Sequence, residues 1–196
     1  MKKLTTLFML MLLAATPLIF TACDDDDEDI AYTLNSDGRD YWRGNLRIQY
    51  DGPGSTSYQT TYSEVEFIKN DNKWAKGHGY WVDYFSDAPW DYQAFHITWK
   101  VRDEIIYIYF EEDHSSIEIR DYRLSDRFFE GDIYMRNKTA HFKFERRRWS
   151  NYHDSFEYWD HGWYNDNDYD HWGSYSKSNG ESKTPEGPFV RSLAVE

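Results

Sequence analysis

The sequence predicts an all-β protein, a single antiparallel meander that forms a small barrel of about eight strands. Apolar and polar residues alternate with a period of two through most of the chain between residues 41 and 148, as in strands that cover one core. Short joins separate these segments, and none of helix length shows the apolar spacing of an amphipathic helix. A meander with one apolar face most simply closes into a barrel.

The alternation is clearest in the segment QAFHITWKV, residues 93–101, where Phe95, Ile97, Trp99 and Val101 share one face. Histidine, threonine and lysine occupy the other face. The same pattern occurs in TAHFKFER and SEVEFIK, residues 139–146 and 63–69. The expected strands are residues 41–50, 60–69, 73–85, 91–102, 105–111, 116–123, 127–135 and 139–147.

Turn residues stand between these strands. Asparagine tolerates a positive φ, so NDN at 70–72 and RNK at 136–138 are plausible hairpin turns, and RDE at 102–104 is a weaker one. Gly77 and Gly79 lie inside an expected strand, where we expect a sharp bend or a bulge. The barrel domain should therefore span residues 40–148.

The first 22 residues have the layout of an export signal. Lys2 and Lys3 precede an uncharged apolar run from residue 4 to residue 20, which is short for a membrane-spanning helix. Small residues then precede Cys23, the only cysteine, and this arrangement resembles the lipobox of bacterial lipoproteins. The resemblance implies removal of residues 1–22 and lipidation of Cys23, which would tether the protein to a membrane. The alternatives are an ordinary signal peptide with a free thiol, and an uncleaved membrane anchor.

Six acidic residues follow at positions 24–29. This run resembles the surface-export signal of Bacteroides-group lipoproteins, which implies a location in the outer membrane facing the cell exterior. The alternative is a solvated spacer that holds the domain off the membrane. In either case we expect residues 23–39 to be a lipidated cysteine and an acidic linker.

Composition excludes several classes of function. Without residues 1–22 the chain has 20 basic and 35 acidic residues, a net charge of −15, which disfavours nucleic acid as a partner. With Cys23 lipidated, disulfides, thiolate zinc sites and cysteine nucleophiles are excluded. The chain has neither a G-x-S-x-G nucleophile elbow nor a phosphate-binding glycine loop, so we expect no enzyme and no cofactor.

The barrel region resembles two groups of proteins. Trp42 and Gly44 in the first strand, with the cluster Arg146, Arg147 and Arg148 in the last, are similar to the lipocalins, which pair a first-strand tryptophan with a late arginine. The lipocalin order is Gly-x-Trp, so we carry over no residue role. Segments such as TYSEVEF, GHGYWVDYF and DYRLSDRFFEG resemble uncharacterised Bacteroides-group lipoproteins, a resemblance that implies no activity.

An irregular aromatic tail follows the barrel. Residues 149–173 are rich in aromatic residues, aspartate and histidine, and residues 174–196 have the composition of a disordered tail. The Asp-His pairs could bind a metal, but a solvated acidic segment is the simpler interpretation and we expect no metal site. Trp159, Trp163 and Trp172 could stack on sugar rings, or could pack back onto the barrel.

Two functions remain open. The first is a binding module, either for a small apolar ligand in an interior lined by Trp81, Phe95 and Trp99, or for a glycan at the tail tryptophans or a barrel rim. The alternative is a structural or interaction lipoprotein that joins a protein partner in an envelope complex and has no small-molecule ligand. A cavity of some hundreds of Å³ would favour the first, and an interior filled by its own side chains the second.

Overall fold

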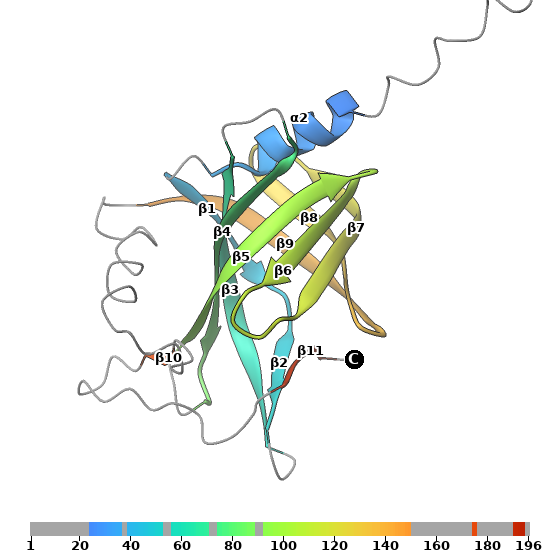
Figure 1. Ribbon diagram of the computed structural model, residues 1–196. Helices are drawn as coiled ribbons and strands as arrows, with labels where there is room; N and C mark the ends of the chain where they lie inside the picture. Colours follow the sequence, from blue (N-terminus) through green and yellow to red (C-terminus); the bar gives the residue numbers. More distant parts are fainter. Residues whose placement is uncertain are drawn as a thin grey trace, which may run out of the picture.

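A computed structural model of the chain describes residues 24–36, 39–52, 56–70, 74–88, 92–149, 174–175 and 190–194, with only the backbone described at 24–25 and 174–175. It confirms the predicted fold class, a closed antiparallel barrel of eight meander strands (Figure 1). The eight are β1 (Asp40–Asn45), β3 (Ser57–Lys69), β4 (Lys76–Phe85), β5 (Tyr92–Arg102), β6 (Ile105–Phe110), β7 (Ser116–Leu124), β8 (Phe128–Met135) and β9 (Lys138–Arg148).

The barrel closes through β1, which pairs with a strand on each side. Trp42 lies opposite Arg146 of β9 and opposite Val65 of β3. Strand β2 (Ile48–Asp51) continues the line of β1 and pairs with the first part of β3. Two further strands come from the end of the chain: β10 (Ser174–Tyr175) pairs with β5, and β11 (Val190–Leu193) pairs with β2.

The observed strands agree with the predicted ones to within a few residues, with one division. The predicted strand 41–50 is interrupted at Leu46 and Arg47, where Arg47 has a φ of 52°. The hairpin turns use the same left-handed region, since Asp103 and Glu104 have φ values of 52° and 59°. Residues 71 and 72 of the predicted NDN turn lie outside the described residues.

Gly77 and Gly79 form no bulge, because both pair in regular register with β3 and with β5. A Cβ on Gly77 would lie 2.7 Å from the Trp99 ring and 1.9 Å from the Ile68 carbonyl oxygen. The glycine therefore lets the ring approach the backbone. The irregularity in this pair lies instead between Thr60 and Tyr62.

The predicted acidic linker differs most from the structure. Helix α2 (Asp24–Leu34) lies across one end of the barrel, with Ala31 and Leu34 fully buried (Figure 1). Acidic side chains in its first turns favour a helix through the helix dipole, and Ile30, Ala31 and Leu34 fall on one face. The carboxylate of Asp27 also accepts hydrogen bonds from the two backbone amides of the β5–β6 turn, at 3.1 and 3.0 Å.

Aromatic side chains fill the barrel interior. The ring of Trp81 on β4 lies 5.3 Å from that of Phe110 on β6 and 6.2 Å from that of Phe144 on β9. Trp42 and Phe129 likewise make an edge contact at 5.7 Å between ring centres. Rings from different walls therefore meet within one continuous core. Within the described residues, no helix combines the length and apolar character needed to cross a membrane.

Candidate functional site

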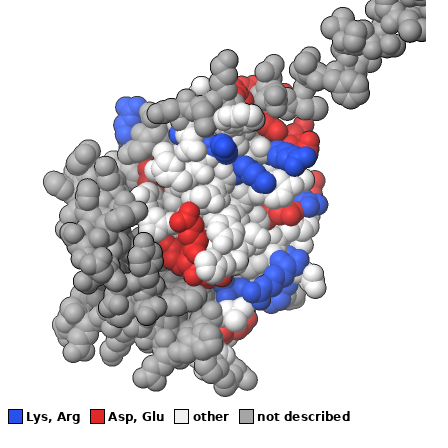
Figure 2. All heavy atoms as spheres, in the orientation of Figure 1, with Lys and Arg blue, Asp and Glu red and all other residues white. Residues whose placement is uncertain are grey.

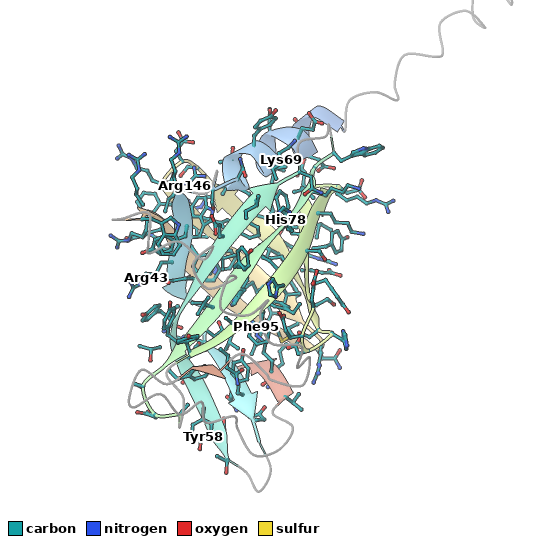
Figure 3. All side chains as sticks on the ribbon, turned by 60° about the vertical axis from the view of Figure 1, so that its left-hand side comes forward. Arg43, Tyr58, Lys69, His78, Phe95 and Arg146 are labelled. Atoms are coloured by element: carbon teal, nitrogen blue, oxygen red, sulfur yellow. The ribbon has the colours of Figure 1, made fainter. Side chains whose placement is uncertain are left out.

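The predicted ligand-binding residues divide into two groups. Trp81, Phe95 and Trp99 point into the barrel and are 0, 3 and 3% exposed, so they are core side chains packed against other rings. Figure 3 shows Phe95 between the barrel walls. Cys23 and the tryptophans Trp159, Trp163 and Trp172 lie outside the described residues. The described part of the chain offers other groups of residues as candidate sites.

Two side chains, of Trp42 and Arg146, form hydrogen bonds to the end of α2 where the helix covers the barrel. The indole of Trp42 donates a hydrogen bond to the carbonyl oxygen of Leu34 at 3.0 Å. The guanidinium of Arg146 donates to the carbonyl oxygens of Thr33 and Asn35 (Figure 3). A helix leaves its last carbonyls without internal partners, and these donors supply them. Arg146 and Trp42 also contact each other, since the guanidinium carbon lies 4.9 Å from the centre of the indole ring.

A charged cluster lies in the interior towards the other end. Asp83 is fully buried and accepts hydrogen bonds from the Tyr50 hydroxyl at 2.7 Å, the Ser63 hydroxyl at 2.5 Å and the Trp81 indole at 2.8 Å. Arg191 of β11 completes the set with a 2.9 Å bond to the same carboxylate. Burial of the hydroxyl, together with the Asp83 carboxylate, holds the pKa of Tyr50 well above its usual value. Tyr50 therefore remains a hydrogen-bond donor to Asp83.

Some polar atoms of this layer have no partner among the described residues. They include Nε and Nη1 of Arg191 and both polar atoms of the Gln93 side chain. Gln93 lies directly opposite Asp83 in the β4–β5 register, so it belongs to the same layer. The Arg191 guanidinium instead faces aromatic rings, with Phe110 at 3.7 Å and Phe95 at 4.8 Å from its carbon. Such contacts stabilise a desolvated cation.

The outer wall of β1, β3, β4 and β5 carries a row of tyrosines. Tyr62 and Tyr84 stack at 4.5 Å, and Tyr41 stacks on Trp149 at 4.1 Å. The Tyr84 hydroxyl donates to the buried Glu64 carboxylate at 3.0 Å. Burial raises the pKa of Glu64, although the Tyr84 hydroxyl and the nearby Arg43 act in the opposite direction. These rings are engaged with one another and with charged neighbours, so this wall is chiefly a packed surface.

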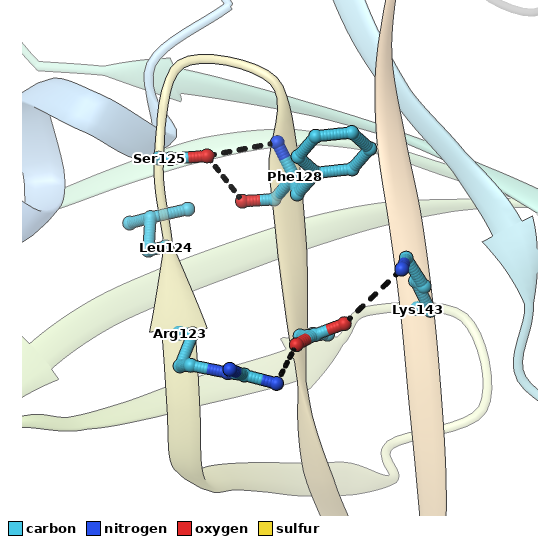
Figure 4. A pocket seen from close by; sticks show the side chains of 6 residues that line it. Arg123, Leu124, Ser125, Phe128 and Lys143 are labelled. Atoms are coloured by element: carbon cyan, nitrogen blue, oxygen red, sulfur yellow. Dashed lines mark hydrogen bonds and ion pairs between the residues drawn. The ribbon is translucent and has the colours of Figure 1, made fainter.

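A pocket of about 230 Å³ lies on the outer surface at the rim of the barrel, where the β7–β8 turn approaches α2 (Figure 4). The side chain of Phe128 is 45% exposed there, and its ring lies beside charged side chains. Glu130 forms ion pairs with Arg123 on one side and Lys143 on the other. The lining residues are Arg123, Leu124, Ser125, Phe128, Glu130 and Lys143.

The pocket is fixed by the strand register and by its turn. Glu130 lies opposite both Arg123 of β7 and Lys143 of β9, so the sheet itself brings the three charges together. Ser125 accepts a hydrogen bond from the Phe128 amide at 3.1 Å and holds the turn (Figure 4). Burial would raise the pKa of Glu130, but the charges of Arg123 and Lys143 lower it. Glu130 is therefore ionised and accepts hydrogen bonds.

Charge is mixed over the face that Figure 2 shows, where basic and acidic side chains lie among uncharged ones. Arg120 pairs with Glu118, and Arg147 pairs with Glu145, so neighbouring charges on the barrel compensate one another. Among the described residues, no group of three histidine, cysteine, aspartate or glutamate side chains is placed to hold a metal ion. The Asp-His pairs of the tail lie outside the described residues.

Comparison with known proteins adds little to this picture. No protein-family model matches the chain, and no curated protein matches it in sequence. A redesigned β-barrel of known structure is similar at a TM-score of 0.36 and 9% sequence identity, over 61% of this chain and 95% of that one. The fold assignment therefore rests on the strand pairing itself.

Proposed function

We propose that this protein is a lipid-anchored surface lipoprotein of the Bacteroides-group kind, and that it binds a glycan on the outside of its barrel. The anchor is supported by the export-signal layout of residues 1–22 and by the position of Cys23. Since α2 begins at the next residue, the barrel would be held within about one helix length, ~16 Å, of its anchor. The acidic run would serve both export and the helix.

The observation that supports glycan binding is the rim pocket around Phe128. Its exposed ring offers an apolar face to a pyranose, and Glu130, Arg123 and Lys143 offer both acceptors and donors to hydroxyl groups. The pocket is mostly polar and charged, with Phe128 and Leu124 as its apolar side chains, and convergent polar groups of this kind fix the orientation of a small ligand. The volume of about 230 Å³ suits one sugar ring of a longer chain.

A small apolar ligand in the interior is less well supported, because the rings that would line such a site touch one another across it. A filled interior is the feature expected of the alternative, a structural lipoprotein with a protein partner, so the interior favours that alternative and only the rim pocket favours a glycan. The alternative differs from the glycan proposal in the chemistry of the partner.

The test is binding to a panel of immobilised polysaccharides by the unlipidated chain from residue 24 onwards. The proposal expects at least one glycan to bind, and Phe128→Ala to weaken binding about tenfold or more without lowering the melting temperature. Tyr109→Ala is the matched control, since Tyr109 is a similarly exposed aromatic residue, 42%, on β6. Equal losses in the two variants, or binding to a protein partner that both retain, would overturn the assignment of the pocket.

The anchor has a separate test. Mass spectrometry of the protein from its native membrane should find acyl chains on Cys23 as the first residue, and Cys23→Ala should release the protein from the membrane fraction. An unmodified thiol would contradict the anchor without bearing on the pocket.

A further inference from the structure

The barrel wall has a seam between β2 and β9. Strand β1 pairs with β9 from Asp40 to Asn45, opposite Arg148 to Lys143. Beyond Arg47 the chain continues as β2, which pairs with β3 but with no residue of β9, and the first residues of β9 have no partner in β1. Strand β11 lies at this seam (Figure 1).

The last strand is held there mainly through backbone groups. Its four residues pair antiparallel with β2, from Val190 opposite Asp51 to Leu193 opposite Ile48. On the β9 side, the Lys138 ammonium donates to the Leu193 carbonyl oxygen at 2.9 Å. This is the arrangement by which an extended peptide adds to an exposed sheet edge, where backbone bonds give affinity and alternate side chains give specificity.

The alternate side chains of β11 point into the barrel. Arg191 is 3% exposed and reaches Asp83, and Leu193 is fully buried in the core. Val190, one residue before the arginine, is 41% exposed. The inward positions are thus occupied by an arginine and, two residues later, a leucine.

The receptor for the arginine belongs to the barrel and not to β11. Asp83 of β4 is fixed by Tyr50 of β2, Ser63 of β3 and Trp81 of its own strand. Phe110 of β6 supplies the aromatic face at 3.7 Å. These groups hold the carboxylate ready for a cation whichever segment carries it. Residues 149–189 separate β11 from β9 in the sequence, and within them β10 pairs with β5.

We propose that the seam between β2 and β9 is a binding site for an extended peptide segment that carries an arginine followed two residues later by a leucine. This chain fills the site with its own residues 190–193. The site accepts the same sequence when the covalent connection is cut.

The experiment uses the complete chain from residue 24, folded first. A recognition sequence for a site-specific protease is inserted between Thr184 and Pro185, and the folded protein is then cleaved there. Gel filtration measures whether the fragment 185–196 stays with the barrel, and fluorescence anisotropy measures its exchange for a labelled synthetic peptide of the same sequence. The competing peptides carry Arg191→Gln or, as the matched control, Val190→Ala.

We expect the cleaved fragment to co-elute with the barrel and to exchange for the labelled peptide. The Arg191→Gln peptide should compete at least tenfold more weakly than the wild-type peptide, and the Val190→Ala peptide equally well. If the wild-type fragment stays bound but does not exchange, the chain that carries Arg191→Gln is cleaved in the same way. Release of the Arg191→Gln fragment from the barrel, while the wild-type fragment is retained, supports the site. Loss of the wild-type fragment without rebinding at ~1 mM peptide, or equal competition by Arg191→Gln, would overturn the proposal.

Discussion

The guanidinium of Arg146 lies 4.9 Å from the centre of the Trp42 ring and bonds at the same time to carbonyl oxygens at the end of α2. One side chain from the last meander strand thus joins the first strand to the helix that covers the barrel. The side chain is 18% exposed, so its charge is largely removed from water. Because Arg146 contacts both β1 and α2, one side chain stabilises the pairing that closes the barrel and the packing of the helix over its end.

Replacement of Arg146 by alanine should therefore destabilise the protein. Loss of the cation–π contact and of charge-assisted hydrogen bonds predicts a decrease of about 3 kcal/mol in the free energy of unfolding. Urea denaturation measures this change. Arg148→Ala is the control, because that side chain is 81% exposed and should cost less than about 1 kcal/mol. Equal effects of the two changes would show that the contact with α2 adds no stability.

The buried pair of Asp83 and Arg191 should show strong coupling. Asp83→Asn leaves the arginine uncompensated and should lower the free energy of unfolding by about 3–5 kcal/mol. Arg191→Met should lower the free energy of unfolding much less in the Asp83→Asn chain than in the wild type. The reason is that it removes the charge that Asp83→Asn leaves unpaired. A double-mutant cycle in urea measures the coupling, and strictly additive effects would contradict the pair.

The filled interior makes a prediction about cavities. Phe110→Ala should cost about 3–5 kcal/mol and leave a cavity among the surrounding rings. An apolar cavity of that kind binds small apolar molecules such as benzene, which the wild-type protein should not bind. Calorimetric titration with benzene compares the two proteins. Binding of benzene by the wild type would show that the interior already contains such a space.

Glu64 should make stability depend on pH. Burial raises its pKa in the folded protein above the unfolded value near 4.5, so the folded state holds the proton more tightly. The resulting stability is present below pH 4.5 and is lost as pH rises through the raised pKa. Relative to wild type, Glu64→Gln should therefore gain unfolding free energy as pH rises from about 4.5 through the raised pKa. Glu145→Gln, at a 49% exposed side chain, should show no such gain, and parallel pH profiles would refute the prediction.

The strands were predictable because alternation is a local property. The alternating positions of Phe95, Ile97 and Trp99 indicate in the sequence which face of the strand is buried. The turn residues indicate where the strands end. Helix α2 was missed because only Ile30, Ala31 and Leu34 form its buried face, and the acidic run before them resembles a solvated spacer. The lipocalin resemblance drew attention to Trp42 and the arginine cluster, but only the β1–β9 register shows that Arg146 is the partner.

The candidate sites could not be predicted in the same way. Arg191 stands in a short segment after a stretch rich in serine, proline and glycine, and its partner Asp83 is 108 positions away. The rim pocket depends on a register that places Arg123, Glu130 and Lys143 on three neighbouring strands. Burial also decides the role of Trp81, Phe95 and Trp99, whose apolar faces fit a ligand site and a packed core equally well in the sequence.

We propose that ligands bind to the outside of the barrel and not in its filled interior. The most direct measurement is the melting temperature of the unlipidated chain from residue 24 with saturating fatty acids and with soluble polysaccharides. A ligand that binds only the folded state raises the melting temperature by mass action. We predict that at least one polysaccharide raises it and that Phe128→Ala abolishes the shift, while fatty acids leave it unchanged. A fatty acid that raises the melting temperature of the wild type would contradict the account.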